Sequence, residues 1–160
     1  MRTSLIQPIE IYFQEISVIV DEPKDSGDER IVPSDFDQWQ GIQFSSKHDF
    51  DIIQEDNRSL VEVKFQLEIP NTDGVKLAYK INISVTGKFV TLVNSSQQKE
   101  ENILDLTVVN GTSMLYSVVR EKLLEITSRM KPGAILLPSF NFMDARPSIQ
   151  NDGTDQSEED

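Results

Sequence analysis

NGTSMLYSVVREKLLEITSRMKPGAILLPSFNF, residues 110–142, decides the fold of this chain, because it joins an amphipathic helix to a long apolar segment. Apolar side chains recur every three or four residues and share one helical face: Leu115, Val118, Val119, Leu123, Ile126 and Met130. Asn110, Thr112 and Ser113 are candidate N-caps, and Lys131-Pro132-Gly133 is a stop signal. The stretch predicts a helix that begins near Asn110 and ends near Met130.

The segment after the stop is too apolar for an ordinary surface loop. Its apolar members are Ala134, Ile135, Leu136, Leu137, Phe140 and Phe142. Exposed apolar segments of this size usually mark a binding surface. We therefore expect the segment to lie on its own domain, on a sister subunit or on a bound client.

Composition limits the possible functions. The chain has 160 residues, 27 acidic and 15 basic, and a net charge of −12, so phosphate repulsion argues against a nucleic-acid partner. It contains no cysteine, which excludes disulfides and thiol chemistry. The N-terminus does not resemble a signal peptide, and no apolar run approaches the ~20 residues that span a membrane. We expect one cytoplasmic domain with no membrane insertion.

Four stretches show the alternation of β-strands. Residues 9–20 alternate with a one-residue slip after Phe13, which predicts a bulge. Residues 42–52 give a weaker pattern that Ser46 and His48 interrupt. Residues 61–69 and 75–89 alternate clearly and flank a turn at residues 70–74. One apolar and one polar face per strand predicts an antiparallel sheet.

The connections are polar. Residues 21–35 hold many charges, two prolines and a glycine, and predict a mobile loop. Residues 103–109 fit either a short helix or an extended connector. The final NDGTDQSEED is typical of a disordered acidic tail. The pattern predicts an α+β fold, a four-stranded antiparallel sheet with one long helix, in a domain of residues 1–144 followed by a tail of residues 145–160.

Sites for chemistry are scarce. His48 is the one histidine, and no Gly-x-Ser-x-Gly elbow or phosphate-binding glycine loop is present. The acidic clusters fall in expected loops or in the tail. The sequence therefore predicts neither an enzyme nor a cofactor or metal site. Surplus aromatic side chains are the stronger signal, and for Trp39, Phe140 and Phe142 core packing and partner binding both remain open.

The order of motifs resembles the SecB family of export chaperones. The matching residues are Ile11-Tyr12 with Glu15-Ile16-Ser17, then Trp39-Gln40, then LYSVVRE at residues 115–121, and finally Leu137-Pro138-Ser139-Phe140-Asn141-Phe142. The resemblance covers roughly residues 9–144. It implies a sheet with a long helix at a subunit interface, and assembly as a dimer or a dimer of dimers.

The resemblance also implies an ATP-independent holdase that binds unfolded or newly made polypeptides in apolar grooves. Trp39, Tyr79 and Val118 match positions that line the client groove in the family, and residues 136–142, with Leu136, Phe140 and Phe142, would form its wall. Glu15 matches a position that docks the export motor ATPase.

Two departures from the family pattern affect the expected role. Ile19 and Asn82 stand where the motor-docking patch is acidic, which weighs against standard export. Pro147 allows at most about a turn of the family's second helix, so that helix is expected to be truncated. Three roles remain: a general or export holdase, a dedicated chaperone of one partner such as an antitoxin, and a structural or assembly protein that uses the same fold.

Overall fold

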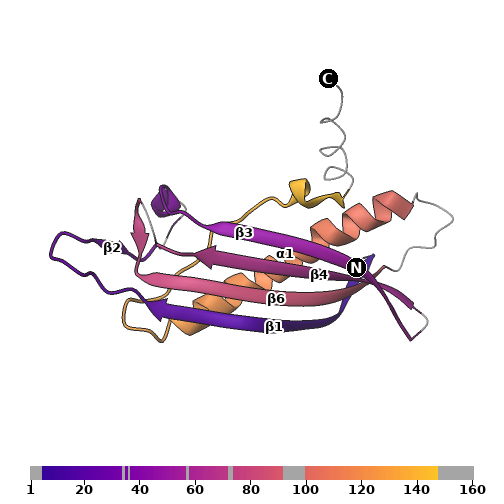
Figure 1. Ribbon diagram of the computed structural model, residues 1–160, viewed down its shortest axis with the longest axis horizontal. Helices are drawn as coiled ribbons and strands as arrows, with labels where there is room; N and C mark the ends of the chain where they lie inside the picture. Colours follow the sequence, from indigo (N-terminus) through magenta and orange to yellow (C-terminus); the bar gives the residue numbers. More distant parts are fainter. Residues whose placement is uncertain are drawn as a thin grey trace, which may run out of the picture.

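The computed structural model describes residues 5–33, 35, 37–56, 58–71, 74–91 and 100–147, without the side chains of residues 100 and 101. Its elements, in chain order, are β1 (Ile6–Val20), β2 (Arg30–Ile31), η1 (Asp37–Trp39), β3 (Ser45–Glu55), β4 (Arg58–Ile69), β5 (Lys76–Leu77), β6 (Tyr79–Thr91), α1 (Glu100–Thr127) and η2 (Met143–Ala145). Figure 1 shows the long helix behind the sheet.

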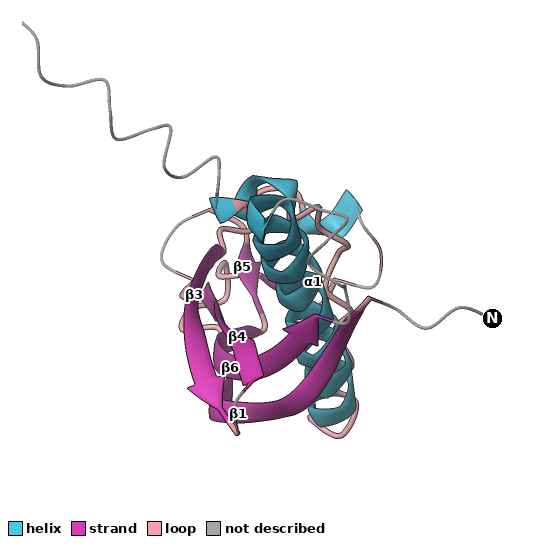
Figure 2. Ribbon diagram, turned by 90° about the vertical axis from the view of Figure 1, so that its right-hand side faces the viewer, coloured by secondary structure: helices cyan, strands magenta, loops and turns pink. Residues whose placement is uncertain are grey.

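The main sheet confirms the predicted α+β architecture. It has four strands in the order β1-β6-β4-β3, and every neighbouring pair is antiparallel. The short strands β2 and β5 form a separate parallel pair. Seen along the strands, the sheet curls around α1 (Figure 2). One face of the sheet is therefore covered by the helix, while β1 and β3 form its two edges.

The predicted bulge in β1 is confirmed. The register shifts between Phe13 and Glu15, so that Phe13 lies opposite Val85 and Ile16 lies opposite Ile83. Val85 and Ile83 point to the same buried face of β6. The extra residue thus keeps both apolar runs of β1 on the helix side of the sheet. A second shift after Pro8 was not predicted, although proline cannot donate a ladder hydrogen bond.

The predicted start of the helix is wrong. Residues 103–109 belong to α1, which begins at Glu100, so the expected N-caps lie inside the helix. Asn110 donates to the Leu106 carbonyl (2.7 Å) and Ser113 to the Val109 carbonyl (2.8 Å). Such bonds to the preceding turn let capping-type residues sit in a helix interior. The predicted stop is confirmed, because α1 ends at Thr127 and Gly133 takes a positive φ of 110°.

Two glycines let α1 approach the sheet closely. A Cβ added to Gly87 of β6 would lie 2.8 Å from Leu115 Cδ2 and from the Phe89 ring. A Cβ on Gly111 of α1 would lie 3.0 Å from Phe89 Cε2. Leu115, Val119 and Leu123 are fully buried at this contact. The helix is thus packed against backbone, with little space for a larger residue at either glycine.

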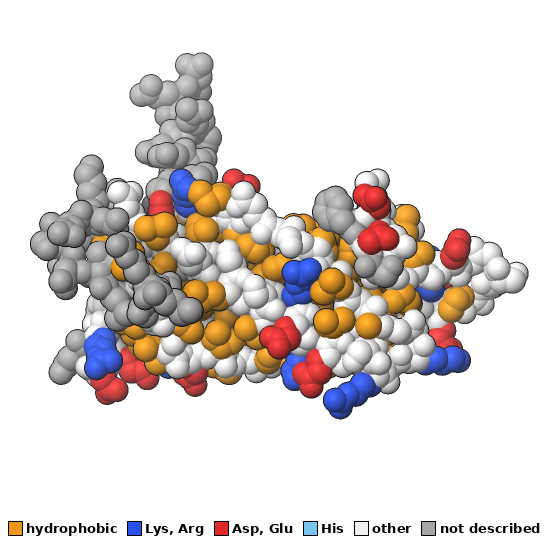
Figure 3. Space-filling view, turned by 180° about the vertical axis from the view of Figure 1, so that it is seen from behind, with side chains coloured by type: hydrophobic (Ala, Val, Ile, Leu, Met, Phe, Trp, Pro, Cys, Tyr) orange, Lys and Arg blue, Asp and Glu red, His pale blue; other side chains and the backbone are white. Residues whose placement is uncertain are grey.

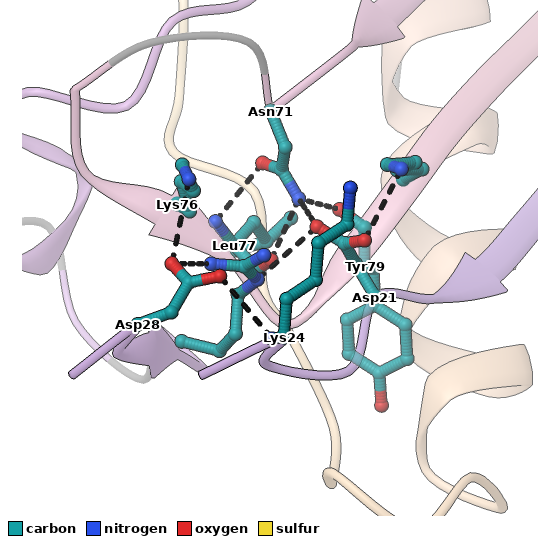
Figure 4. A network of polar contacts seen from close by, with 9 residues as sticks. Asp21, Lys24, Asp28, Asn71, Lys76, Leu77 and Tyr79 are labelled. Carbon is teal, nitrogen blue, oxygen red and sulfur yellow. Dashed lines mark hydrogen bonds and ion pairs between the residues drawn. The ribbon is translucent and has the colours of Figure 1, made fainter. Parts of the chain in front are cut away.

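The segment predicted to be a mobile loop is tied to the sheet by ion pairs (Figure 4). The side chain of Arg30, only 6% exposed, pairs with Asp28 and, over 3.1 Å, with Asp21. Lys76 adds a 3.3 Å contact to Asp28. The Arg30 guanidinium beside it lowers the pKa of Asp28 to about 2. Arg30 neutralises two acidic residues of its own loop, and the distant Lys76 adds a contact that local composition does not reveal.

Asn71 joins this network to the sheet. Its amide donates to the carbonyls of Leu77 (2.7 Å) and Tyr79 (3.0 Å), and its oxygen accepts from the Leu77 N–H (3.0 Å). Asn71 has a positive φ of 56°, a conformation that asparagine tolerates better than most residues. The side chain therefore closes the connection between β4 and β6.

Gly87→Ala should destabilise the fold by about 1–3 kcal/mol, because the new methyl group overlaps Leu115 and Phe89. Urea unfolding measures the change. Gly27→Ala is the matched control, since a Cβ there meets nothing within 4 Å, and it should stay within about 0.5 kcal/mol of the parent. Equal stability of the two variants would contradict the close helix–sheet contact.

The Arg30 network should make stability depend on acid pH. The folded-state pKa of Asp28 lies below its ordinary value of 3.8, so its contribution is present above about pH 4 and is lost as the pH falls toward about 2. The difference in melting temperature between the parent and Arg30→Met should therefore shrink over this range. Exposed Lys47→Met should show a difference that does not change with pH.

Candidate functional site

The apolar segment after the helix lies across the chain's own core, and we call residues 133–142 the strap. Ile135 and Leu137 are buried, whereas Leu136 and Phe140 are each 39% exposed. Alternating side chains of an extended segment point to opposite sides. The alternation holds at residues 134–137, where Ile135 and Leu137 anchor the strap and Leu136 is displayed. Beyond it Pro138 is buried and Phe140 is exposed. This answers the question that the sequence left open, because the strap rests on its own domain.

Hydrogen bonds from distant side chains hold the strap backbone. Three aromatic residues donate to strap carbonyls: Tyr79 to Gly133 (2.6 Å), Trp39 to Leu136 (3.0 Å) and Tyr116 to Pro138. Burial raises the pKa of both tyrosine hydroxyls, which keeps them protonated as donors. A buried backbone carbonyl needs such a partner, so these contacts fix the path of the strap.

A threonine adds a fourth anchor from the end of α1. The buried Thr127 hydroxyl accepts the N–H of Ile135 (3.0 Å) and donates to the Leu123 carbonyl (2.7 Å). It therefore links the last turn of the helix to the inward-facing part of the strap. Neither Thr127 nor its partner forms a recognisable sequence motif, so pattern reasoning missed this contact.

Aromatic rings continue from the core to the surface at the distal half of the strap. Tyr116 lies in the middle, with ring centroids 5.3 Å from Phe140, 5.4 Å from Phe142 and 5.9 Å from Phe65. Phe44, just before β3, lies 5.0 Å from Phe140. The tilted and edge-on geometries are those that aromatic pairs prefer. Phe140 is thus the outermost ring of a packed cluster.

The structure places the predicted groove residues at different depths. Trp39 is 6% exposed and Tyr79 is fully buried, and both support the strap from the core side. Val118 and Phe142 are half-buried. Of this set, Leu136 and Phe140 display the most surface. For Trp39 the structure selects core packing from the two alternatives, whereas client binding by the set stays a prediction.

The position predicted to dock an export motor lies on the other face of the sheet. Glu15 is exposed in β1, opposite Ser84 of β6. Nearby Ile19 is exposed and apolar, and the amide oxygen of Asn82 accepts a bond from Gln66 (3.1 Å). This surface is therefore mixed in character, and the role of Glu15 stays a prediction.

The helix side of the molecule has further exposed apolar side chains (Figure 3). Leu106 of α1 and Met143 of η2 are both exposed, and they line one hollow of about 300 Å³ together with Asn102, Asp105, Val109 and Arg146. The single 3₁₀ turn η2 precedes Pro147, and the predicted truncation of the second helix stays a prediction, because the residues after 147 lie outside the described ones. The predicted disordered tail lies, from residue 148 onward, outside the described residues.

The described residues contain no group of three or more His, Cys, Asp or Glu side chains that would suit a metal ion. They also contain no helix with the length and apolar character needed to cross a membrane.

Comparison with known proteins gave structural neighbours alone. No protein-family model matches this chain, and no curated protein matches its sequence. A SecB-like chaperone from Mycobacterium tuberculosis, Rv1957, solved in complex with a ChAD peptide from the Rv1956 HigA1 antitoxin, is similar with a TM-score of 0.46 and 15% identity, over 84% of this chain and 90% of that one. A protein of unknown function from Streptococcus agalactiae has a TM-score of 0.46 and 11% identity, over 84% and 97% of the two chains. Neither similarity assigns a function or a site residue here.

Trp39→Ala should destabilise the protein by about 3–5 kcal/mol, because it empties a buried site and leaves the Leu136 carbonyl without its donor. Phe140→Ala should cost about 1 kcal/mol or less, since its ring is partly in water already. Chemical unfolding of both variants tests this order. If Trp39→Ala is as stable as the parent, Trp39 is not a core residue and partner binding becomes its better interpretation.

Proposed function

We propose that this protein is a chaperone-type holdase, which binds apolar segments of non-native polypeptides without hydrolysing a nucleotide. The binding surface is the strap face, defined by the exposed side chains Leu106, Leu136, Phe140 and Met143. The observation that supports it best is Phe140, which contacts Phe44 and Tyr116 but remains 39% exposed. A client side chain placed there would bury apolar surface at about 25 cal/mol per Å².

The edge of β3 adjoins this surface through Phe44, which directly precedes the strand and contacts Phe140. Within the described part of the chain no strand pairs with the outer edge of β3. Ile52, on the helix side of β3 opposite Val61, is strongly exposed. An extended client segment would pair with this strand edge irrespective of its sequence, which is what a holdase with many clients requires.

The finer role follows from the breadth of binding. A general holdase, for export or otherwise, binds many unfolded chains, whereas a dedicated chaperone binds one partner such as an antitoxin. Exposed Ile19 and hydrogen-bonded Asn82 beside Glu15 weigh against docking of an export motor there. A structural or assembly protein would instead bind a folded partner. We favour the holdase because the strap face is apolar and sits beside an unpaired strand edge.

Assembly into a homo-oligomer, a dimer or a dimer of dimers, belongs to the same proposal. The support is the long edge strand β1, whose exposed apolar residues include Ile9, Ile16 and Ile19. Edge strands of this length are usually paired or covered. A stable monomer in sedimentation at micromolar concentration would contradict this part of the proposal.

Phe140→Ala should weaken the suppression of client aggregation about fivefold, because roughly 1 kcal/mol of ring burial is lost. Light scattering of several unrelated unfolded clients, with the protein titrated against each, measures the effect. Val75→Ala, an exposed apolar residue in the connection between β4 and β5 that belongs to neither proposed surface, is the control and should match the parent. Failure to protect any client would refute the holdase, and protection of one client alone would indicate a dedicated partner.

A further inference from the structure

A hollow of about 260 Å³ lies beside the strap, between η1 and α1. Its lining residues are Asp35, Trp39, Arg120, Leu136, Leu137, Pro138 and Ser139. The hollow is smaller than a typical cofactor or drug pocket. Its size suits one side chain, and its walls are mostly apolar.

The guanidinium of Arg120 is the unusual group in this hollow. Its Nε is buried and has no hydrogen-bond partner among the described residues, and the ion pairs found within them do not include Arg120. By contrast, the buried guanidinium of Arg30 contacts two carboxylates. The Nε itself is closed to solvent, but the Arg120 side chain as a whole is half-buried and lines the hollow, so a ligand there would meet the other guanidinium nitrogens. The chain has 27 acidic residues against 15 basic ones. Even so, no described carboxylate forms an ion pair with Arg120.

The chemistry of the hollow selects a single carboxylate. A guanidinium offers a fixed fork of donors that matches a carboxylate in geometry and charge. The indole N–H of Trp39 is already donated to the Leu136 carbonyl, which leaves its ring as an apolar wall. Asp35 on the rim would repel a second negative charge. Apolar groups next to the bound carboxylate would rest on Leu136, whose side chain is partly exposed.

We propose that Arg120 binds the side-chain carboxylate of an aspartate or glutamate within an extended, otherwise apolar client segment. Side chains two positions away point to the same side of such a segment, so they would meet Leu136 and Phe140 on the strap face. The inference rests on the proposed holdase function and adds a preferred client feature to it. The strap would then bind the apolar side chains of the client, and Arg120 would select one carboxylate.

Trp39 provides the measurement, because it is the only tryptophan in the chain and lines the hollow. The probes are the end-blocked peptides acetyl-Leu-Ala-Glu-Ala-Phe-amide and its Gln counterpart, titrated against the full chain while tryptophan fluorescence is recorded. The Glu peptide should bind about tenfold more tightly, as one charge-assisted hydrogen bond would give. Arg120→Met should remove this preference.

Two variants separate the site from general charge and from folding. Arg129→Met removes the same charge from an exposed position on the turn after α1 and should keep the Glu preference. Arg120→Lys keeps the charge but not the fork, and should retain part of the preference. If Arg120→Met fails to fold, the two peptides on the unchanged protein and on Arg120→Lys still decide the question.

Several outcomes would overturn the site. Equal binding of the Glu and Gln peptides would contradict the Arg120 site but not the holdase function. Suppression of aggregation without binding of either peptide would have the same meaning. If Arg129→Met also loses the preference for the Glu peptide, that preference is due to the net charge of the protein and not to Arg120. If a Gln peptide with a free C-terminus binds more tightly than the end-blocked Glu peptide, the ligand of Arg120 is a terminal carboxylate and not a side-chain carboxylate. No peptide binding together with no suppression of aggregation refutes both proposals.

Discussion

The close contact between α1 and β6 is the constraint on which the rest of the structure depends. Gly87 and Gly111 remove side chains where the two elements meet, and Leu115 and Phe89 fill the remaining space. This contact sets the height of the helix above the sheet and therefore the position of Tyr116, one residue after Leu115. Tyr116 in turn orders the strap, through its hydrogen bond to Pro138 and its contacts with Phe140 and Phe142. A larger residue at Gly87 would thus disturb the strap as well as the core.

The strap follows from an imbalance between the two layers. One helix contacts β1, β4 and β6 but leaves β3 largely uncovered. Beside the helix the strap adds apolar surface: Ile135 and Leu137 are buried, and Phe142 contacts Phe65 of β4. An extended segment cannot bury all of its side chains against one layer, so Leu136 is displayed between the buried Ile135 and Leu137. Phe140 is displayed at the outer side of the aromatic cluster. The surface proposed to bind clients is therefore generated by the same segment that completes the core.

Regular elements were predictable from sequence because each depends on a local period. The strand at residues 61–69, the bulge after Phe13 and the stop near Gly133 all appear in the structure. The strand predicted at residues 75–89 is divided at Ala78 into β5 and β6, which lie in different sheets. The helix start was missed because Asn110 and Ser113 are good caps in isolation, yet here they bond to the preceding turn. The contacts that tie residues 21–33 to Asn71 and Lys76, and the Trp39–Leu136 bond, depend on partners far away in sequence. No local pattern reports such pairs.

A surface that binds apolar clients must stay extended when no client is present. Left to apolar contacts alone, the strap would collapse so as to hide Leu136 and Phe140 from water. Hydrogen bonds to its carbonyls prevent this, because they fix the backbone through groups that do not depend on the exposed side chains. Trp39 makes two contributions to this arrangement. Its N–H donates to the Leu136 carbonyl, and its ring lines the hollow beside Arg120. In the proposed function, stability and client binding would thus use different atoms of the same residues, so that a buried tryptophan supports an open surface.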